Sequence, residues 1–176
     1  MLPGLGDSGP AHWQSLWEAH DPGIRRVRQR DWDAPVRDDW VRMLEDALAE
    51  RSEPVVLAGH STGAILVAHW LRDAAPAQIA RVAGALIVAP SDPLGPNYPA
   101  GPTGFDPVPT AAMPFRAIVV ASDRDPYAAL EWSRRHAQAW GADCVVLHDA
   151  GHINTDSGHG AWPDGYALLE RLRARD

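Results

Sequence analysis

Short apolar runs alternate with amphipathic stretches along this chain of 176 residues. The apolar runs predict strands at Ile24–Gln29, Pro54–Gly59, Ala83–Ala89, Arg116–Ala121 and Asp143–Leu147. The amphipathic stretches predict helices at Ala11–His20, Val36–Arg51, Ala64–Ala74, Tyr127–Trp140 and Trp162–Ala174. Strands that alternate with helices are typical of an α/β protein, so we expect a three-layer α/β/α sandwich with a mostly parallel sheet.

One segment departs from this alternation. Residues 90–114 contain eight prolines and three glycines, and this composition excludes a regular helix or strand. A long irregular segment inside a compact α/β domain is usually functional. We therefore expect it to shape a binding pocket.

Composition and charge narrow the class of protein. The length suits one domain, residues 1–176, and the 45% hydrophobic content argues against disorder. A formal net charge of −7 without a dense basic stretch argues against nucleic-acid binding. The one cysteine, Cys144, excludes an internal disulfide. No secretory signal and no membrane-spanning apolar run is visible, so we expect a soluble cytoplasmic protein without membrane association.

The most informative motif is the Gly-His-Ser-Thr-Gly sequence of Gly59–Gly63. It lies between a predicted strand and a predicted helix, and G-x-S-x-G in that context is typical of a nucleophile elbow. Side chains two residues before and after the serine would collide in such a turn, so glycine is needed at both places. We predict that Ser61 is a catalytic nucleophile in a strained conformation. The alternative is that Ser61 only caps the following helix.

A serine nucleophile needs a base, and the base needs an acid that orients it. On a sheet of this kind the acid and then the base follow the serine, each on a loop after a strand. His152 lies a few residues beyond the strand that ends at Leu147, and Gly151 before it allows a tight turn. We therefore predict His152 as the base. The preceding loop offers two carboxylates, Asp123 and Asp125, and the residues alone leave the choice open.

The tetrahedral intermediate of acyl transfer carries an oxyanion that needs N–H donors. We predict the backbone N–H of Thr62 and, in the Gly-rich loop Pro3–Gly6, that of Leu5. His12 and Trp13 follow this loop and are candidates for substrate binding; a first-turn histidine beside a packed tryptophan is the alternative. The histidines and aspartates of residues 148–159 match no metal-ligand spacing, and no nucleotide-binding glycine loop occurs. We expect no metal and no cofactor.

Residues 2–17, the elbow, residues 122–126 and residues 150–152 together resemble the small serine hydrolases of the RBBP9/YdeN type. The resemblance covers most of the chain and implies a minimal α/β-hydrolase fold without a cap domain. It implies Ser61, Asp125 and His152 as the triad, because the family's acid is the aspartate directly before a proline. The family usually has a complete strand before the Pro-Gly loop, of which two residues are present here. An L-x-C-x-E element, on which a protein partner of the vertebrate member depends, is absent, so that partner is not expected.

The sequence and the resemblance together predict a metal-independent, carboxylesterase-like serine hydrolase. It would cleave small acyl esters through an acyl-enzyme intermediate. Two alternatives share the same fold: an interaction module with little turnover, and an acyltransferase that uses the same triad.

Overall fold

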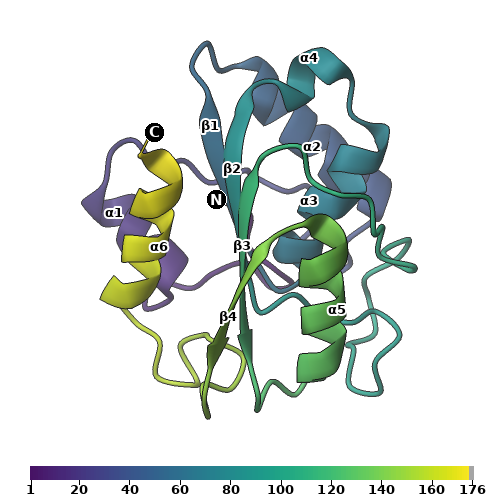
Figure 1. Ribbon diagram of the computed structural model, residues 1–176, viewed down its shortest axis with the longest axis vertical. Helices are drawn as coiled ribbons and strands as arrows, with labels where there is room; N and C mark the ends of the chain where they lie inside the picture. Colours follow the sequence, from purple (N-terminus) through teal and green to yellow (C-terminus); the bar gives the residue numbers. More distant parts are fainter. Residues whose placement is uncertain (175–176) are drawn as a thin grey trace.

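In the computed structural model, residues 1–174 are described, and they form a four-stranded sheet between two layers of helices (Figure 1). The strands are β1 (Val55–His60), β2 (Val82–Val88), β3 (Arg116–Ser122) and β4 (Asp143–Leu147). The helices are α1 (Trp13–His20), α2 (Arg37–Ala49), α3 (Thr62–Asp73), α4 (Pro76–Ile79), α5 (Leu130–Trp140) and α6 (Pro163–Arg173). The predicted three-layer sandwich is confirmed. The last two residues of the expected domain, 175–176, lie outside the described residues.

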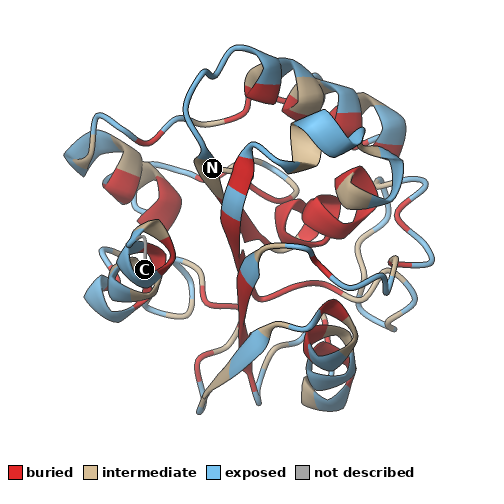
Figure 2. Cartoon of the chain, turned by 45° about the horizontal axis from the view of Figure 1, so that its top comes forward, coloured by how far each residue is buried: buried red, intermediate tan, exposed pale blue. Residues whose placement is uncertain are grey.

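The sheet is parallel throughout, in the order β1-β2-β3-β4. Because helices cover both faces, most residues of β2 and β3 are buried (Figure 2). Successive residues still face opposite layers. Leu57 packs in the core shared with α2, α3 and α5, whereas Ala58 packs in the core shared with α1 and α6. The two cores fix the sheet between the helix layers, and the parallel pairing places the carboxyl ends of all strands at one edge.

Among the predicted helices, the start that shifts most is that of α5, and one helix, α4, was not predicted. The helix predicted from Tyr127 begins at Leu130. The carboxylate of Asp125 accepts the N–H of Tyr127 at 2.9 Å, and this bond holds the residues before the helix in a turn. The short helix α4 was not predicted, because four residues are too few to show a hydrophobic repeat.

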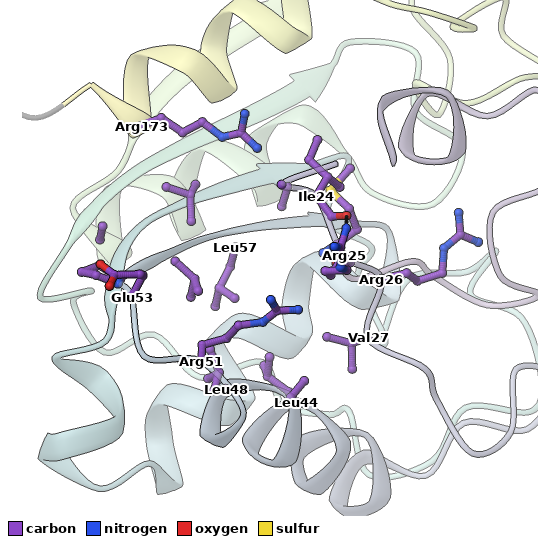
Figure 3. Close-up of a pocket in the computed structure, with 18 of the residues that line it drawn as sticks. Ile24, Arg25, Arg26, Val27, Leu44, Leu48, Arg51, Glu53, Leu57 and Arg173 are labelled. Atoms are coloured by element: carbon purple, nitrogen blue, oxygen red, sulfur yellow. Dashed lines mark hydrogen bonds between the residues drawn. The ribbon is translucent and has the colours of Figure 1, made fainter. Parts of the chain in front are cut away.

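The strand predicted at Ile24–Gln29 is wrong, because this extended segment joins no ladder of the sheet. Two backbone hydrogen bonds join it to Met1: the N–H of Val27 donates to the Met1 carbonyl at 2.9 Å, and the Met1 amino group donates to the Arg25 carbonyl at 2.5 Å. A groove of about 880 Å³ lies between this segment and β1 (Figure 3). Only Ile24 and Val27 of its six residues are apolar, and among the described residues no neighbouring strand lies beside it to pair with.

Residues 90–114 contain no helix and no strand, as their prolines predicted. Backbone N–H groups near the start, middle and end of the segment tie it to the rest of the fold: Asp92, Thr103 and Met113 donate to the carbonyls of Tyr127, Pro35 and Trp140. In the described part of the chain, no helical cap is inserted between β2 and β3. Among the same residues, no helix has the length and apolar character needed to cross a membrane.

Candidate active site

Four polar side chains lie on the loops that follow the four strands. Ser61 follows β1, Ser91 follows β2, Asp125 follows β3 and His152 follows β4. The carboxyl ends of parallel strands meet at one edge of a sheet, where α/β proteins bind their ligands. A cavity of about 220 Å³ lies at this edge, and Ser61, Ser91 and His152 are among the residues that line it.

The turn that carries Ser61 is strained, as the motif predicted. Ser61 has φ 58° and ψ −124°, a region that costs a non-glycine residue about 1–3 kcal/mol. A Cβ on Gly59 would lie 2.5 Å from the carbonyl oxygen of Gly63, and a Cβ on Gly63 would lie 2.1 Å from that of Leu2. Glycine is therefore required on both sides of the serine: at Gly59 because of the turn itself, as predicted, and at Gly63 because the start of the chain packs against it.

His152 and Asp125 form a buried pair. Nδ1 of His152 lies 2.9 Å from each carboxylate oxygen of Asp125, and the two side chains are only 9% and 4% exposed. Because a carboxylate only accepts hydrogen bonds, Nδ1 carries the proton and Nε2 of the neutral ring keeps a lone pair. In this tautomer His152 is able to accept a proton at Nε2.

Asp123, the other carboxylate on the same loop, makes different contacts. Its Oδ1 accepts the N–H of Asp149 at 2.8 Å, and its Oδ2 lies 2.8 Å from Nδ1 of His148. The backbone hydrogen bond of Asp149, followed by the contact with His148, holds the pKa of Asp123 below its usual value. Asp123 therefore holds the loop that leads to His152, and Asp125 is the carboxylate that contacts the imidazole of His152.

The hydroxyl of Ser61 is bonded to Ser91. The two Oγ atoms are 3.0 Å apart, and within residues 1–174 no hydrogen bond joins Ser61 to His152. Hydrogen bonds between catalytic groups are often long without substrate and shorten when it binds. Ser91 belongs to no motif and could not be predicted from the sequence; the pairing of β1 with β2 brings it beside the elbow.

Two backbone N–H groups beside Ser61 are unpaired. Those of Leu5 and Thr62 have no acceptor among the described residues, and both residues line the cavity. Thr62 begins α3, where the first N–H groups of a helix lack an internal partner. The Leu5 loop comes close to the nucleophile, since a Cβ on Gly4 would lie 2.8 Å from the Cβ of Ser61. These are the kind of donors that an oxyanion requires.

The two residues predicted to bind substrate lie in different places. His12 lines the cavity and caps α1, because its Nδ1 accepts the N–H of Gln14 at 3.2 Å. Burial, the largest cause, lowers the pKa of His12 to about 4, so the ring is neutral at neutral pH. Trp13 is fully buried and its Nε1 donates to the Ile153 carbonyl at 3.0 Å. The expectation for Trp13 is corrected: it packs behind the cavity.

His60 joins the elbow to the loop of His152. Its Nε2 donates to the carbonyl oxygen of His152 at 2.9 Å, and its ring lies 4.8 Å, centroid to centroid, from the rings of both His12 and His152. Burial lowers the pKa of His60 well below its usual value. This neutral histidine therefore has a structural role beside the nucleophile.

The groove beside β1 is larger than the cavity at Ser61 but lacks the groups for catalysis. Its lining contains no serine, threonine, cysteine or histidine, and so offers neither a hydroxyl or thiol nucleophile nor an imidazole base. The smaller cavity is therefore the candidate active site. Across residues 1–174, no group of three or more His, Cys, Asp and Glu side chains is arranged to hold a metal ion.

Comparison with known proteins places the fold among hydrolases. A family model described as "Serine hydrolase" matches residues 1–171. The crystal structure of a YdeN-like hydrolase from Pectobacterium atrosepticum is 33% identical, covers 97% of this chain and 87% of that chain, and has a TM-score of 0.86. No curated protein matches the chain.

Two more distant structures share the fold. The ydeN gene product of Bacillus subtilis is 20% identical, covers 98% of this chain and 96% of that chain, and has a TM-score of 0.72. A hydrolase of the alpha/beta superfamily from Xanthomonas campestris is also 20% identical, with the same coverage and a TM-score of 0.62. The expected minimal α/β-hydrolase fold is therefore confirmed.

Proposed function

Because the chain belongs to the serine hydrolase family, we propose that it is a carboxylesterase-like enzyme that cleaves small acyl esters. Membership of this family makes the chain a hydrolase of a small-molecule substrate. That the bond it cleaves is an ester is our proposal. One observation carries it: Ser61 shares a cavity with His152, which is bonded to Asp125, and with the unpaired backbone N–H groups of Leu5 and Thr62. A nucleophile, an oriented base and oxyanion donors are what acyl transfer needs.

In the proposed mechanism, Ser61 gives its hydroxyl proton to Nε2 of His152 while its Oγ bonds to the acyl carbon. Asp125 holds the tautomer and stabilises the imidazolium that forms. The N–H groups of Leu5 and Thr62 bind the oxyanion. His152 then protonates the leaving alcohol, and an acyl group remains on Ser61. A water molecule, deprotonated by His152, attacks this ester and releases the acid.

The size of the cavity favours a short acyl group. Its volume of about 220 Å³ lies below the range of roughly 300–1,000 Å³ of pockets for larger ligands. Pro99, from the irregular segment 90–114, and Tyr127 contribute to its wall. We propose that residues 1–176 act as one hydrolase domain whose preferred substrates carry short acyl chains.

The test is activity-based labelling together with ester hydrolysis. The wild-type protein, Ser61→Ala and His152→Ala are treated with a fluorophosphonate probe and with p-nitrophenyl esters of increasing acyl length. We expect labelling of the wild type, loss of labelling in Ser61→Ala, and the fastest hydrolysis with the shortest esters. A wild type that neither reacts with the probe nor hydrolyses any ester would overturn the proposal.

Two other outcomes identify the alternatives. Labelling without turnover of esters, thioesters or amides would favour an interaction module. New esters or amides formed with added alcohol or amine acceptors would identify an acyltransferase. Product analysis separates acyl transfer from hydrolysis, and the lack of any turnover separates the interaction module from both.

A further inference from the structure

Ser91 is a buried polar residue at the site that the proposed mechanism leaves unused. It is 2% exposed and lines the cavity. Among the described residues its hydroxyl has a single hydrogen-bond partner, Oγ of Ser61 at 3.0 Å. A buried hydroxyl normally makes a hydrogen bond. The partner here is the atom that is proposed to attack the substrate.

The backbone fixes the two serines relative to each other. The N–H of Ser61 donates to the Val88 carbonyl at 3.0 Å, so the elbow is bonded to the last residue of β2. On the loop that follows, the N–H of Ala89 donates to the Val120 carbonyl at 2.8 Å, and that of Asp92 donates to the Tyr127 carbonyl at 3.0 Å. Ser91 is therefore held on both sides, and its distance from Ser61 does not depend on a mobile loop.

The tautomer of His152 sets the direction of the hydrogen bond. Nδ1 of His152 donates to Asp125, so Nε2 is an acceptor and a productive Ser61 donates its proton to it. The oxygen of Ser61 is then left with lone pairs only, and the hydroxyl of Ser91 is the group beside it that can donate. In the productive state, with Ser61 bonded to Nε2 of His152, this direction gives both hydroxyl protons an acceptor.

We propose that Ser91 is a further catalytic residue, whose hydroxyl donates to Oγ of Ser61 and stabilises the negative charge that this oxygen carries in the transition states. The inference rests on the proposed hydrolase mechanism. In acylation, the O–H bond of Ser61 breaks, its proton moves to His152, and the Oγ–C bond forms. In deacylation, the Oγ–C bond breaks, its electron pair stays on Oγ, and the imidazolium returns the proton. Ser91 keeps its own proton in both steps, and its hydrogen bond strengthens as Oγ gains charge.

The test compares variants that differ in one hydroxyl. Ser91→Thr and Ser91→Val have nearly the same shape and differ only in a hydroxyl against a methyl group, while Ser91→Ala removes the hydroxyl without adding bulk. Ser133→Ala, a buried serine on α5 that is 3% exposed, is the control for a loss of stability alone. Initial burst rates of a p-nitrophenyl ester report acylation, steady-state rates report deacylation, and thermal midpoints report folding.

We expect kcat/KM to fall about 10- to 100-fold in Ser91→Ala, as for the loss of a hydrogen bond to a charged oxygen. Both the burst and the steady-state rate should fall, with a thermal midpoint close to that of Ser133→Ala. Ser91→Thr should be at least tenfold faster than Ser91→Val.

Equal or higher rates in Ser91→Ala would overturn the proposal, and higher rates would mean that Ser91 restrains the nucleophile. Equal rates in Ser91→Thr and Ser91→Val would overturn it too, because the loss would follow packing. Both results leave the proposed function intact while wild-type turnover depends on Ser61. If the wild type shows no Ser61-dependent turnover, the proposed function fails, and the role of Ser91 fails with it.

Discussion

Replacing Gly63 by alanine tests how the elbow is packed against the start of the chain. The added Cβ would lie 2.1 Å from the carbonyl oxygen of Leu2 and 2.3 Å from that of Pro3, about 1.3 Å and 1.1 Å inside an ordinary contact of 3.4 Å. The Leu2 carbonyl cannot withdraw freely, because it accepts hydrogen bonds from the N–H of His60 at 3.0 Å and from Nε2 of Gln14 at 3.2 Å.

The size of the effect follows from these contacts. Overpacking a tight site costs about 1–3 kcal/mol, and two disrupted hydrogen bonds cost about 0.5–1.5 kcal/mol each. We expect Gly63→Ala to lower the free energy of unfolding by about 2–6 kcal/mol. For a chain of this size, about 2–4 °C is lost per kcal/mol, so the thermal midpoint should fall by at least about 4 °C. Ester hydrolysis should fall as well, because the displaced backbone leads directly into the Leu5 loop.

Thermal and urea unfolding of the wild type, Gly63→Ala and Gly9→Ala provide the assay. Gly9 is the matched control, because a Cβ there would meet nothing within 4 Å. Its midpoint should stay within about 1–2 °C of the wild type, as for surface substitutions. If Gly63→Ala unfolds at the same midpoint as Gly9→Ala, the chain end is not packed rigidly on the elbow and the reasoning is wrong.

Three further results are expected. Asp125→Asn should lower kcat about 10⁴-fold through the wrong His152 tautomer, whereas Asp123→Asn should lower it little; equal losses in ester-hydrolysis assays would contradict the assignment. The free energy of unfolding should fall as the pH drops from about 6.5 to about 4. Burial lowers the pKa of His12 and of His69 to about 4 in the folded protein. Between these pH values, therefore, only the unfolded chain takes up protons on the two histidines. The slope is up to about 1.4 kcal/mol per pH unit for each histidine, and urea midpoints at pH 7 and pH 5 that coincide would refute it. Gln14→Leu should cost about 1–3 kcal/mol in urea unfolding and should slow ester hydrolysis, because this buried amide bonds the Leu2 and Ala58 carbonyls; unchanged unfolding would show that the amide does not hold the chain end.

Most of the fold could be predicted from the sequence because its elements are contiguous. β1, β2, β3 and β4 each have an apolar run of their own, and the five longer helices have helical spacing. The strand predicted at Ile24–Gln29 is wrong, because its two apolar residues, Ile24 and Val27, do not show that a neighbouring strand lies beside the segment. Strand formation depends on a partner distant in sequence, and that information is absent from a local pattern.

The same difference between local and long-range information applies to the candidate site. Ser61 and the glycines around it carry a local motif, and His152 could be found from its place after a strand. The choice between Asp123 and Asp125 could not be made from the residues, since both lie on the loop after β3; only the contacts with His148 and His152 separate them. Ser91 carries no motif, and only the pairing of β1 with β2 brings it beside the nucleophile.

The loop that contains Leu5 has a fixed conformation, and neither secondary-structure propensity nor strand pairing explains it. Leu2 pairs with β1 through a single bridge, so strand pairing alone does little to hold the start of the chain in place. Buried polar side chains supply the rest. Gln14 donates to the carbonyls of Leu2 and Ala58, and the guanidinium of Arg26 bonds the carboxylate of Asp7 and the carbonyl of Ser8. These bonds hold the chain on both sides of Leu5. The opening segment, residues 2–17, therefore contains both the loop and the Gln14 amide that holds it.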